Sequence, residues 1–133
     1  MDGNEIVRRY VDEIVNENRV SVIDEIFDAD YVNHTPGGDL QGREAMKAFI
    51  ARVRAMLPDV QATVHDMFAA GDRVAVRLTL TGRYHGEVLG VTYQGVPITL
   101  SEMQIYRLAN AKIAERWFIP DWRSAWRQLG AIR

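Results

Sequence analysis

The stretch VPITLSEMQIYRLANAKIAERWFIPD, residues 96–121, decides the fold that this sequence predicts. Residues 96–108 and 112–119 are rich in β-branched and aromatic side chains, and Ala109-Asn110-Ala111 separates the two runs. Asparagine tolerates the left-handed backbone conformation that a tight turn requires. The pattern therefore predicts a β-hairpin.

The second strand of this hairpin ends at an acidic residue. Because side chains alternate between the two faces of a strand, Trp117, Ile119 and Asp121 are expected on one face. Asp121 follows an apolar run and a proline, which places its carboxylate beside apolar surface. Removal from water raises the pKa of a carboxyl group, which can then act as acid or base near neutral pH. The alternative is a helix N-cap, since Asp is a favoured cap and a helical pattern begins near Trp122.

Composition narrows the class of protein. The chain has 133 residues, 47% of them apolar and 26% charged, which fits one globular domain over residues 1–133. A net charge of −2 with mixed signs gives no electrostatic footprint for nucleic acid or an anionic membrane. There is no cysteine, so disulfides and thiolate chemistry are excluded. The charged N-terminus and the lack of any run of ~20 apolar residues predict no signal peptide or membrane span, with the cytoplasm as the expected location.

Helices dominate the first half of the chain. Apolar residues at helical spacing predict helices over residues 4–18 and 43–57. Ser21 and Asp24 fit a capping box for a short helix that ends near Phe27. An extended segment, DYVNHT at residues 30–35, runs into Pro36-Gly37-Gly38.

Strands follow from residue 60, where the apolar period changes to two. Residues 60–68 and 74–81 alternate as half-buried strands, and the three glycines of residues 86–95 suggest a loop at a pocket mouth. Helices first and strands second predict an α+β fold, a strongly curved antiparallel sheet wrapped around N-terminal helices. Such a cone holds an internal pocket suited to small molecules.

Two motifs carry a family resemblance. The segment NHTPGGDLQGREAMKAFI, residues 33–50, and the pattern Ile-x-Glu-x-Trp-x-x-x-Asp, residues 113–121, resemble the SnoaL-like polyketide cyclases of the NTF2-like superfamily. The resemblance covers nearly the whole chain. It implies acid–base chemistry without cofactor or metal: an Asp at the end of the last long strand takes a proton from an aromatic polyketide, the enolate closes a ring by an aldol reaction, and the same acid protonates the alkoxide.

The resemblance assigns the general base to Asp121. His34 is a candidate partner, because a carboxylate nearby would favour its charged form. Asn33 and Gln104 match polar pocket positions. Family cyclases carry a histidine close to Tyr106, and tyrosine cannot replace it as a base near neutral pH.

Further pocket residues follow from strand and helix periods. Glu102, Gln104 and Tyr106 share one strand face, which is either the pocket wall or the solvent face. Trp117 is expected in the core or the pocket wall, where its indole could stack on a flat ligand. Phe49 and Tyr10 face inward from their helices. The three histidines have no regular ligand spacing, so no metal site is predicted.

Other functions share this fold. A non-catalytic protein that binds small hydrophobic molecules is the main alternative, and an isomerase or epoxide hydrolase is the other. The partner is expected to be a small aromatic or hydrophobic molecule. Apolar alternation on more than one strand, Met103 and Ile105 among it, together with the resemblance, predicts a homodimer.

Overall fold

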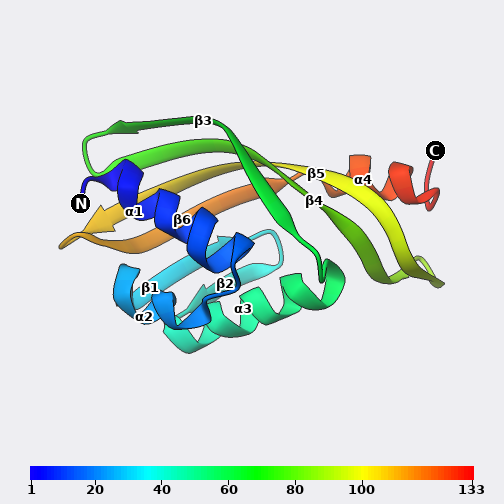
Figure 1. Cartoon of the computed structure of the whole chain (residues 1–133), viewed down its shortest axis with the longest axis horizontal. Helices are drawn as coiled ribbons and strands as arrows, with labels where there is room; N and C mark the ends of the chain where they lie inside the picture. The colour runs from blue at the N-terminus through cyan, green and yellow to red at the C-terminus, as the bar shows by residue number, and fades with distance from the viewer.

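The computed structural model covers residues 1–133 and has an α+β architecture, as the sequence predicted (Figure 1). Its helical elements are α1 (Gly3–Arg9), η1 (Tyr10–Asn16), η2 (Val20–Val22), α2 (Ile23–Ile26), α3 (Arg43–Met56) and α4 (Trp122–Leu129). Its strands are β1 (Phe27–Thr35), β2 (Gly38–Gln41), β3 (Gln61–Ala70), β4 (Arg73–Val88), β5 (Val91–Ala109) and β6 (Lys112–Pro120).

All six strands form one curved sheet. The strand order is β2-β1-β6-β5-β4-β3. Four of the neighbouring pairs are antiparallel, but β1 runs parallel to β6. The sheet is therefore mixed, where an antiparallel sheet was predicted. Figure 1 shows α1 and η1 crossing the concave side of the sheet and α3 lying below them, while α4 follows β6 at the opposite end from the N-terminus.

The predicted helices are found with small changes. The helix expected over residues 4–18 is an α-helix that continues as the π-helical turn η1, and α3 matches the expected residues 43–57. The predicted capping box at Ser21 is wrong. The first turn there is the 3₁₀ element η2, and no side chain caps α2.

The strands β4 and β5 form a hairpin much longer than the sequence indicated. They remain paired up to Val88 and Val91, so only Leu89 and Gly90 form the turn. The glycines of residues 86–95 had suggested a loop, and this was wrong. Gly95 (φ 87°) is the extra residue where the register shifts between Tyr84 and His85, and Gly86 (φ 151°) pairs in register with Tyr93, so neither glycine ends the ladder.

The turn between β5 and β6 is as predicted. Asn110 and Ala111 have φ of 53° and 59°, the left-handed pair of a two-residue hairpin turn. Beyond the turn the pairing shifts by one residue: Leu108 pairs with Ile113, but Arg107 pairs with Glu115. Ala114 is thus the extra residue of a β-bulge.

This bulge determines which face of β6 points inward. A one-residue change in register moves every following side chain to the other side of the sheet. As a result Arg116 and Phe118 are buried on the concave side, with exposed fractions of 2% and 8%. Trp117 and Ile119 lie on the outer side, where Ile119 is 75% exposed.

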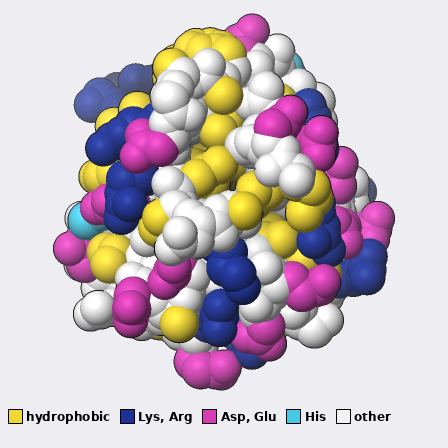
Figure 2. All heavy atoms as spheres, turned by 90° about the vertical axis from the view of Figure 1, so that its left-hand side faces the viewer, with side chains coloured by type: hydrophobic (Ala, Val, Ile, Leu, Met, Phe, Trp, Pro, Cys, Tyr) yellow, Lys and Arg dark blue, Asp and Glu magenta, His cyan; other side chains and the backbone are white.

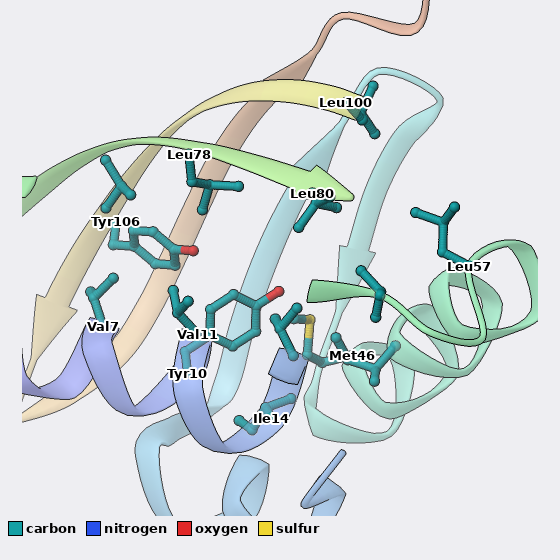
Figure 3. Close-up of a cluster of buried hydrophobic side chains, with 14 of the residues drawn as sticks. Val7, Tyr10, Val11, Ile14, Met46, Leu57, Leu78, Leu80, Leu100 and Tyr106 are labelled. Atoms are coloured by element: carbon teal, nitrogen blue, oxygen red, sulfur yellow. The ribbon is translucent and has the colours of Figure 1, made fainter. Parts of the chain in front are cut away.

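The core fills the cone between the helices and the concave face of the sheet. Figure 3 shows the helix side chains Val7 and Tyr10 on the side of the helix that faces Tyr106 and Leu78 from the strands. Burial of apolar side chains is the main stabilising term of such a core, at roughly 25 cal/mol per Å². Leu57, Leu80 and Leu100 lie toward the far end of this cluster from Val7 in the same view.

The face of the molecule shown in Figure 2 carries no large region of one charge. In Figure 2, Lys and Arg side chains alternate with Asp and Glu around a central area where apolar atoms are visible. No helix is long and apolar enough to cross a membrane.

Candidate active site

A cavity of about 700 Å³ opens between α3, the β1–β2 turn and the concave face of the sheet. Its walls are mainly apolar, with aromatic side chains from three elements. This volume lies within the range of pockets that bind drug-sized molecules, about 300–1,000 Å³. Its charged and aromatic lining side chains are Phe49 and Arg52 from α3, Asp39 from β2, Glu102 from β5, Phe118 from β6 and Trp122 from α4.

Glu102 is the buried carboxylate of this cavity. Its residue is 6% exposed, and it lines both the cavity and a small void of about 30 Å³ that shares Phe49 and Leu80 with it. Burial raises the pKa of Glu102, because the charged form loses its water, while the charge of Arg116 opposes this shift. Glu102 therefore has the environment that the sequence analysis expected for Asp121.

A short chain of hydrogen bonds holds Glu102 in place. Gln104 donates from Nε2 to Glu102 Oε1 at 2.7 Å, and the Tyr106 hydroxyl donates to Gln104 Oε1. All three residues lie on the concave face of β5 at alternate positions, as their shared strand face allowed. The sequence left open whether this face was inside or outside, and the structure places it inside.

Arg116 is a charged side chain in the core, and its place there was not predicted from the sequence. Its Nη2 lies 3.9 Å from Glu102 Oε1, and its Nε donates to the Tyr106 hydroxyl at 3.3 Å. Its Nη1 donates to Asn33 Oδ1 at 3.2 Å. The guanidinium also lies 4.1–5.8 Å from the ring centroids of Tyr10, Phe49, Tyr106 and Phe118. These contacts supply the hydrogen bonds and the aromatic faces that a buried guanidinium needs.

Glu102 is itself a predicted pocket residue, and five others gather around the Glu102–Arg116 pair. Asn33, Glu102, Gln104 and Tyr106 are buried polar groups on the concave side, and Tyr10 and Phe49 cover them from the helices. In Figure 3 Tyr10 and Tyr106 lie near each other, and their ring centroids are 6.0 Å apart. The sequence did contain a signal for Arg116, because it is a charged residue inside an apolar strand. Only the bulge, however, places its side chain on the buried, concave side of the sheet.

His34 and Trp117 lie on the outer side of the sheet, so Trp117 is not in the core or the pocket wall, and the predicted pairing of His34 with Asp121 is not formed. The two rings stack with centroids 5.1 Å apart. His34 forms no hydrogen bond with Asp121. Its Nε2 lies 2.6 Å from Glu115 and its Nδ1 2.8 Å from Asp39, and these hydrogen bonds, Glu115 first, raise the pKa of His34.

Asp121 is exposed, and its carboxylate caps α4. Its Oδ1 accepts a hydrogen bond from the backbone N–H of Ser124 at 3.1 Å. The predicted apolar surroundings of this carboxylate are therefore wrong, and the alternative of a helix cap is what the structure contains. The strand face of Asp121 is the outer one, which explains why the apolar run before it does not bury it.

No three His, Asp or Glu side chains form a cluster with the geometry of a metal site. Glu102 lines the cavity, and behind it the Gln104 amide, the Tyr106 hydroxyl and the Arg116 guanidinium form a buried polar network. Such a set can move a proton and stabilise negative charge in a site shielded from water.

Comparison with known proteins agrees with this geometry. The profile of the SnoaL-like polyketide cyclases matches residues 5–129. This chain belongs to the SnoaL-like polyketide cyclase family. As a family member it shares 26% identity over 132 residues with the aklanonic acid methyl ester cyclase DnrD of Streptomyces peucetius, which covers 95% of this chain and 89% of that protein.

Solved structures extend the likeness to the fold. Wild-type IdmH from Streptomyces antibioticus is 26% identical, with a TM-score of 0.85 over 98% of this chain and 99% of that one. TsrD from Streptomyces laurentii is 25% identical, with a TM-score of 0.85 over 99% of both chains. The predicted SnoaL-like fold and the family are thereby confirmed.

Proposed function

We propose that this SnoaL-like protein closes a ring in an aromatic polyketide-type substrate by an intramolecular aldol reaction, with Glu102 as general base and acid. The observation that carries the proposal is a single buried carboxylate, with raised pKa, in the wall of an apolar cavity. The family supports a cyclase in general, and the relatives DnrD and DauD are named for aklanonic acid methyl ester.

The reaction needs one group that takes and returns a proton. The Glu102 carboxylate removes a proton from a carbon that neighbouring carbonyl groups activate, and the C–H electron pair becomes an enolate. The enolate carbon then bonds to a ketone carbon of the same molecule, and the electrons of that carbonyl form an alkoxide. Glu102, now a carboxylic acid, returns its proton to the alkoxide, so the enzyme ends in its starting state.

Arg116 acts in this proposal as a positioning residue. It lies behind Phe49 and Phe118, which line the cavity, and its charge is 3.9 Å from Glu102. The fixed positive charge of Arg116 opposes the rise that burial causes in the pKa of Glu102, and so favours the ionised form that accepts a proton. The Gln104 amide fixes the direction of the same carboxylate.

Asp121 was the base that the family resemblance implied. Its exposed position as a helix cap gives it neither apolar surroundings nor a place in the cavity lining. The roles of Glu102 and Asp121 can therefore be compared by replacing each carboxylate with its isosteric amide. Asp121→Asn keeps α4 capped, because Asn is as good a helix cap as Asp.

The test measures turnover of aromatic polyketide esters and acids, with aklanonic acid methyl ester as the first substrate. Glu102→Gln is expected to lower kcat by about 10²–10⁴-fold, the usual contribution of general acid–base catalysis. Asp121→Asn is expected to stay within about threefold of the wild type, since it keeps the cap. Wild-type kcat should fall on acidification with a midpoint above 4.5, the ordinary value for Glu, because burial raises this pKa. The opposite ranking of the two variants would refute Glu102 as the base.

Binding without catalysis is the second candidate function. The exposed helix-capping position of Asp121 and the apolar walls of the cavity favour it. In that case the wild type binds flat aromatic ligands but converts none of the substrates, and Glu102→Gln changes nothing except affinity.

We also propose a homodimer that pairs through the outer face of the sheet. Four exposed apolar side chains lie there on three strands: Phe68 (64% exposed), Met103 (62%), Ile105 (44%) and Ile119 (75%). They occupy adjacent rows, since Met103 pairs with Ile119 and Ile105 with Trp117 across β5 and β6. A contiguous apolar patch of this kind is typical of a protein interface.

A further inference from the structure

Three charged side chains line the cavity: Asp39, Arg52 and Glu102. Glu102 lies in the buried wall, next to Arg116. Asp39 and Arg52 are exposed, so they belong to the mouth. The charge that an entering substrate meets therefore depends on how these two residues are paired.

Asp39 belongs to a neutral network. It bonds to His34, which also bonds to Glu115, and Glu115 forms an ion pair with Arg107 at 2.9 Å. The two carboxylates raise the pKa of His34 and so favour its charged form. Two negative and two positive charges then cancel, so Asp39 adds little net negative charge at the mouth.

Arg52 has no such partner. No carboxylate lies within ion-pair distance of its guanidinium, in contrast to Arg9, Arg19, Arg77 and Arg107. Its guanidinium lies 5.9 Å from the ring centroid of Phe49, one helical turn earlier on α3. Phe49 in turn packs edge to face against Phe118, with ring centroids 5.6 Å apart. The unpaired positive charge of Arg52 thus lies at the mouth, next to the aromatic side chains Phe49 and Phe118 that line the cavity.

We propose that Arg52 is a specificity-determining residue that binds a carboxylate on the substrate. This inference rests on the proposed function, and it narrows the substrate class to flat aromatic acids whose carboxylate stays at the mouth while the rings enter the cavity. A guanidinium can donate two parallel hydrogen bonds to a carboxylate, but it gains much less from a neutral ester. Free acids are therefore preferred over their methyl esters by this chain.

The test uses a matched pair of ligands, anthraquinone-2-carboxylate and its methyl ester. Their dissociation constants are measured by calorimetry for the wild type, Arg52→Gln, Arg52→Lys and the control Arg8→Gln. Arg8 is an exposed arginine of α1 that lines no cavity. The two ligands share their ring system, so their affinity ratio isolates the carboxylate.

The wild type is expected to bind the acid about tenfold more tightly than the ester, as for a partly solvated charge-assisted contact. Arg52→Gln should reduce this ratio to about one through weaker binding of the acid, and Arg52→Lys should keep part of it. Arg8→Gln should behave as the wild type. The preference should also shrink when salt is raised from about 50 to about 300 mM, because ions screen exposed charges.

Two results would overturn the inference that Arg52 binds a carboxylate. Only the second of them would also overturn the flat aromatic substrate of the proposed function. If both ligands bind equally to the wild type and to Arg52→Gln, the carboxylate site is refuted, while the cavity and Glu102 chemistry stand. If neither ligand binds the wild type, the flat aromatic substrate of the proposed function is refuted as well.

Discussion

The two faces of the sheet carry similar ion pairs in different surroundings. On the concave face Arg116 and Glu102 are 3.9 Å apart, and their side chains are 2% and 6% exposed. On the outer face Arg107 and Glu115 are only 2.9 Å apart, with side chains 33% and 22% exposed. Removal of one partner from the closer pair is expected to cost less stability, because water screens that pair and solvates the partner that remains.

The difference teaches that burial and not proximity gives these groups their chemistry. Glu102 has a raised pKa because it is desolvated, whereas hydrogen bonds from Arg107 and then His34 lower the pKa of Glu115. Glu115 is a stable anion in a surface network. The raised pKa of Glu102 shifts its titration toward neutral pH, which is the direction that the proposed reaction needs.

The largest expected effect comes from removing the buried cation. Arg116→Met should lower the free energy of unfolding by about 3–5 kcal/mol at neutral pH, because it leaves the Glu102 carboxylate buried without a partner. Arg107→Met, its counterpart on the outer face, should cost no more than about 1 kcal/mol. Urea unfolding followed by circular dichroism measures both values.

The pH dependence of stability in the same variants tests whether the unpaired, buried Glu102 carboxylate causes the loss. Burial holds the Glu102 pKa above its unfolded value, so protonated Glu102 is favoured in the folded state and the loss in Arg116→Met should shrink as the pH falls. Adding Glu102→Gln to Arg116→Met should restore part of the stability, since no unpaired charge remains. Equal losses for Arg116→Met and Arg107→Met would mean that the concave pair is not desolvated.

An intermediate effect is expected on the apolar part of the outer face. Ile119→Glu should weaken the proposed dimer by about 100-fold or more, because it buries an unpaired charge in an apolar interface. Sedimentation velocity across a concentration series measures this. Val91→Glu, on an exposed apolar residue of the β4–β5 hairpin, is the control and should leave the association unchanged. A wild-type chain that is monomeric at every concentration would end the proposal.

The smallest effect is expected from the outer histidine. The pKa of His34 is raised in the fold by Glu115 first and also by Asp39, so its stabilising contribution is complete below the unfolded value of about 6.5 and is lost as the pH rises through the folded value. His34→Gln should remove a few tenths of a kcal/mol, as for an exposed ion pair, and only on the acidic side. Thermal unfolding between about pH 5.5 and 8.5 measures the difference.

His65→Gln is the matched control for this measurement. The His65 ring contacts the Thr79 hydroxyl at 3.1 Å and no carboxylate. Its removal should leave the pH dependence of stability as it is in the wild type. A His34→Gln variant with an unchanged pH profile would show that the two carboxylates do not bind the imidazolium.

Much of the architecture was predictable from sequence because it depends on local patterns. The helical period fixed α1 with η1 and also α3, and the Asn110 turn fixed the β5–β6 hairpin. The glycines near the β4–β5 turn were misleading, since paired strands tolerate glycine when the partner strand supplies the hydrogen bonds. The common face of Glu102, Gln104 and Tyr106 was also predictable, because a strand has a period of two.

Sequence alone therefore determined the family, the order of elements and which residues of a strand share a face. Only the tertiary structure decided which of those faces is inside. The single extra residue at Ala114 shifts the register of β6, so that Arg116 enters the core and Trp117 and Asp121 stay outside. No local pattern contains this information, because a bulge is a property of two strands paired together, and one residue of slip exchanges the two faces completely.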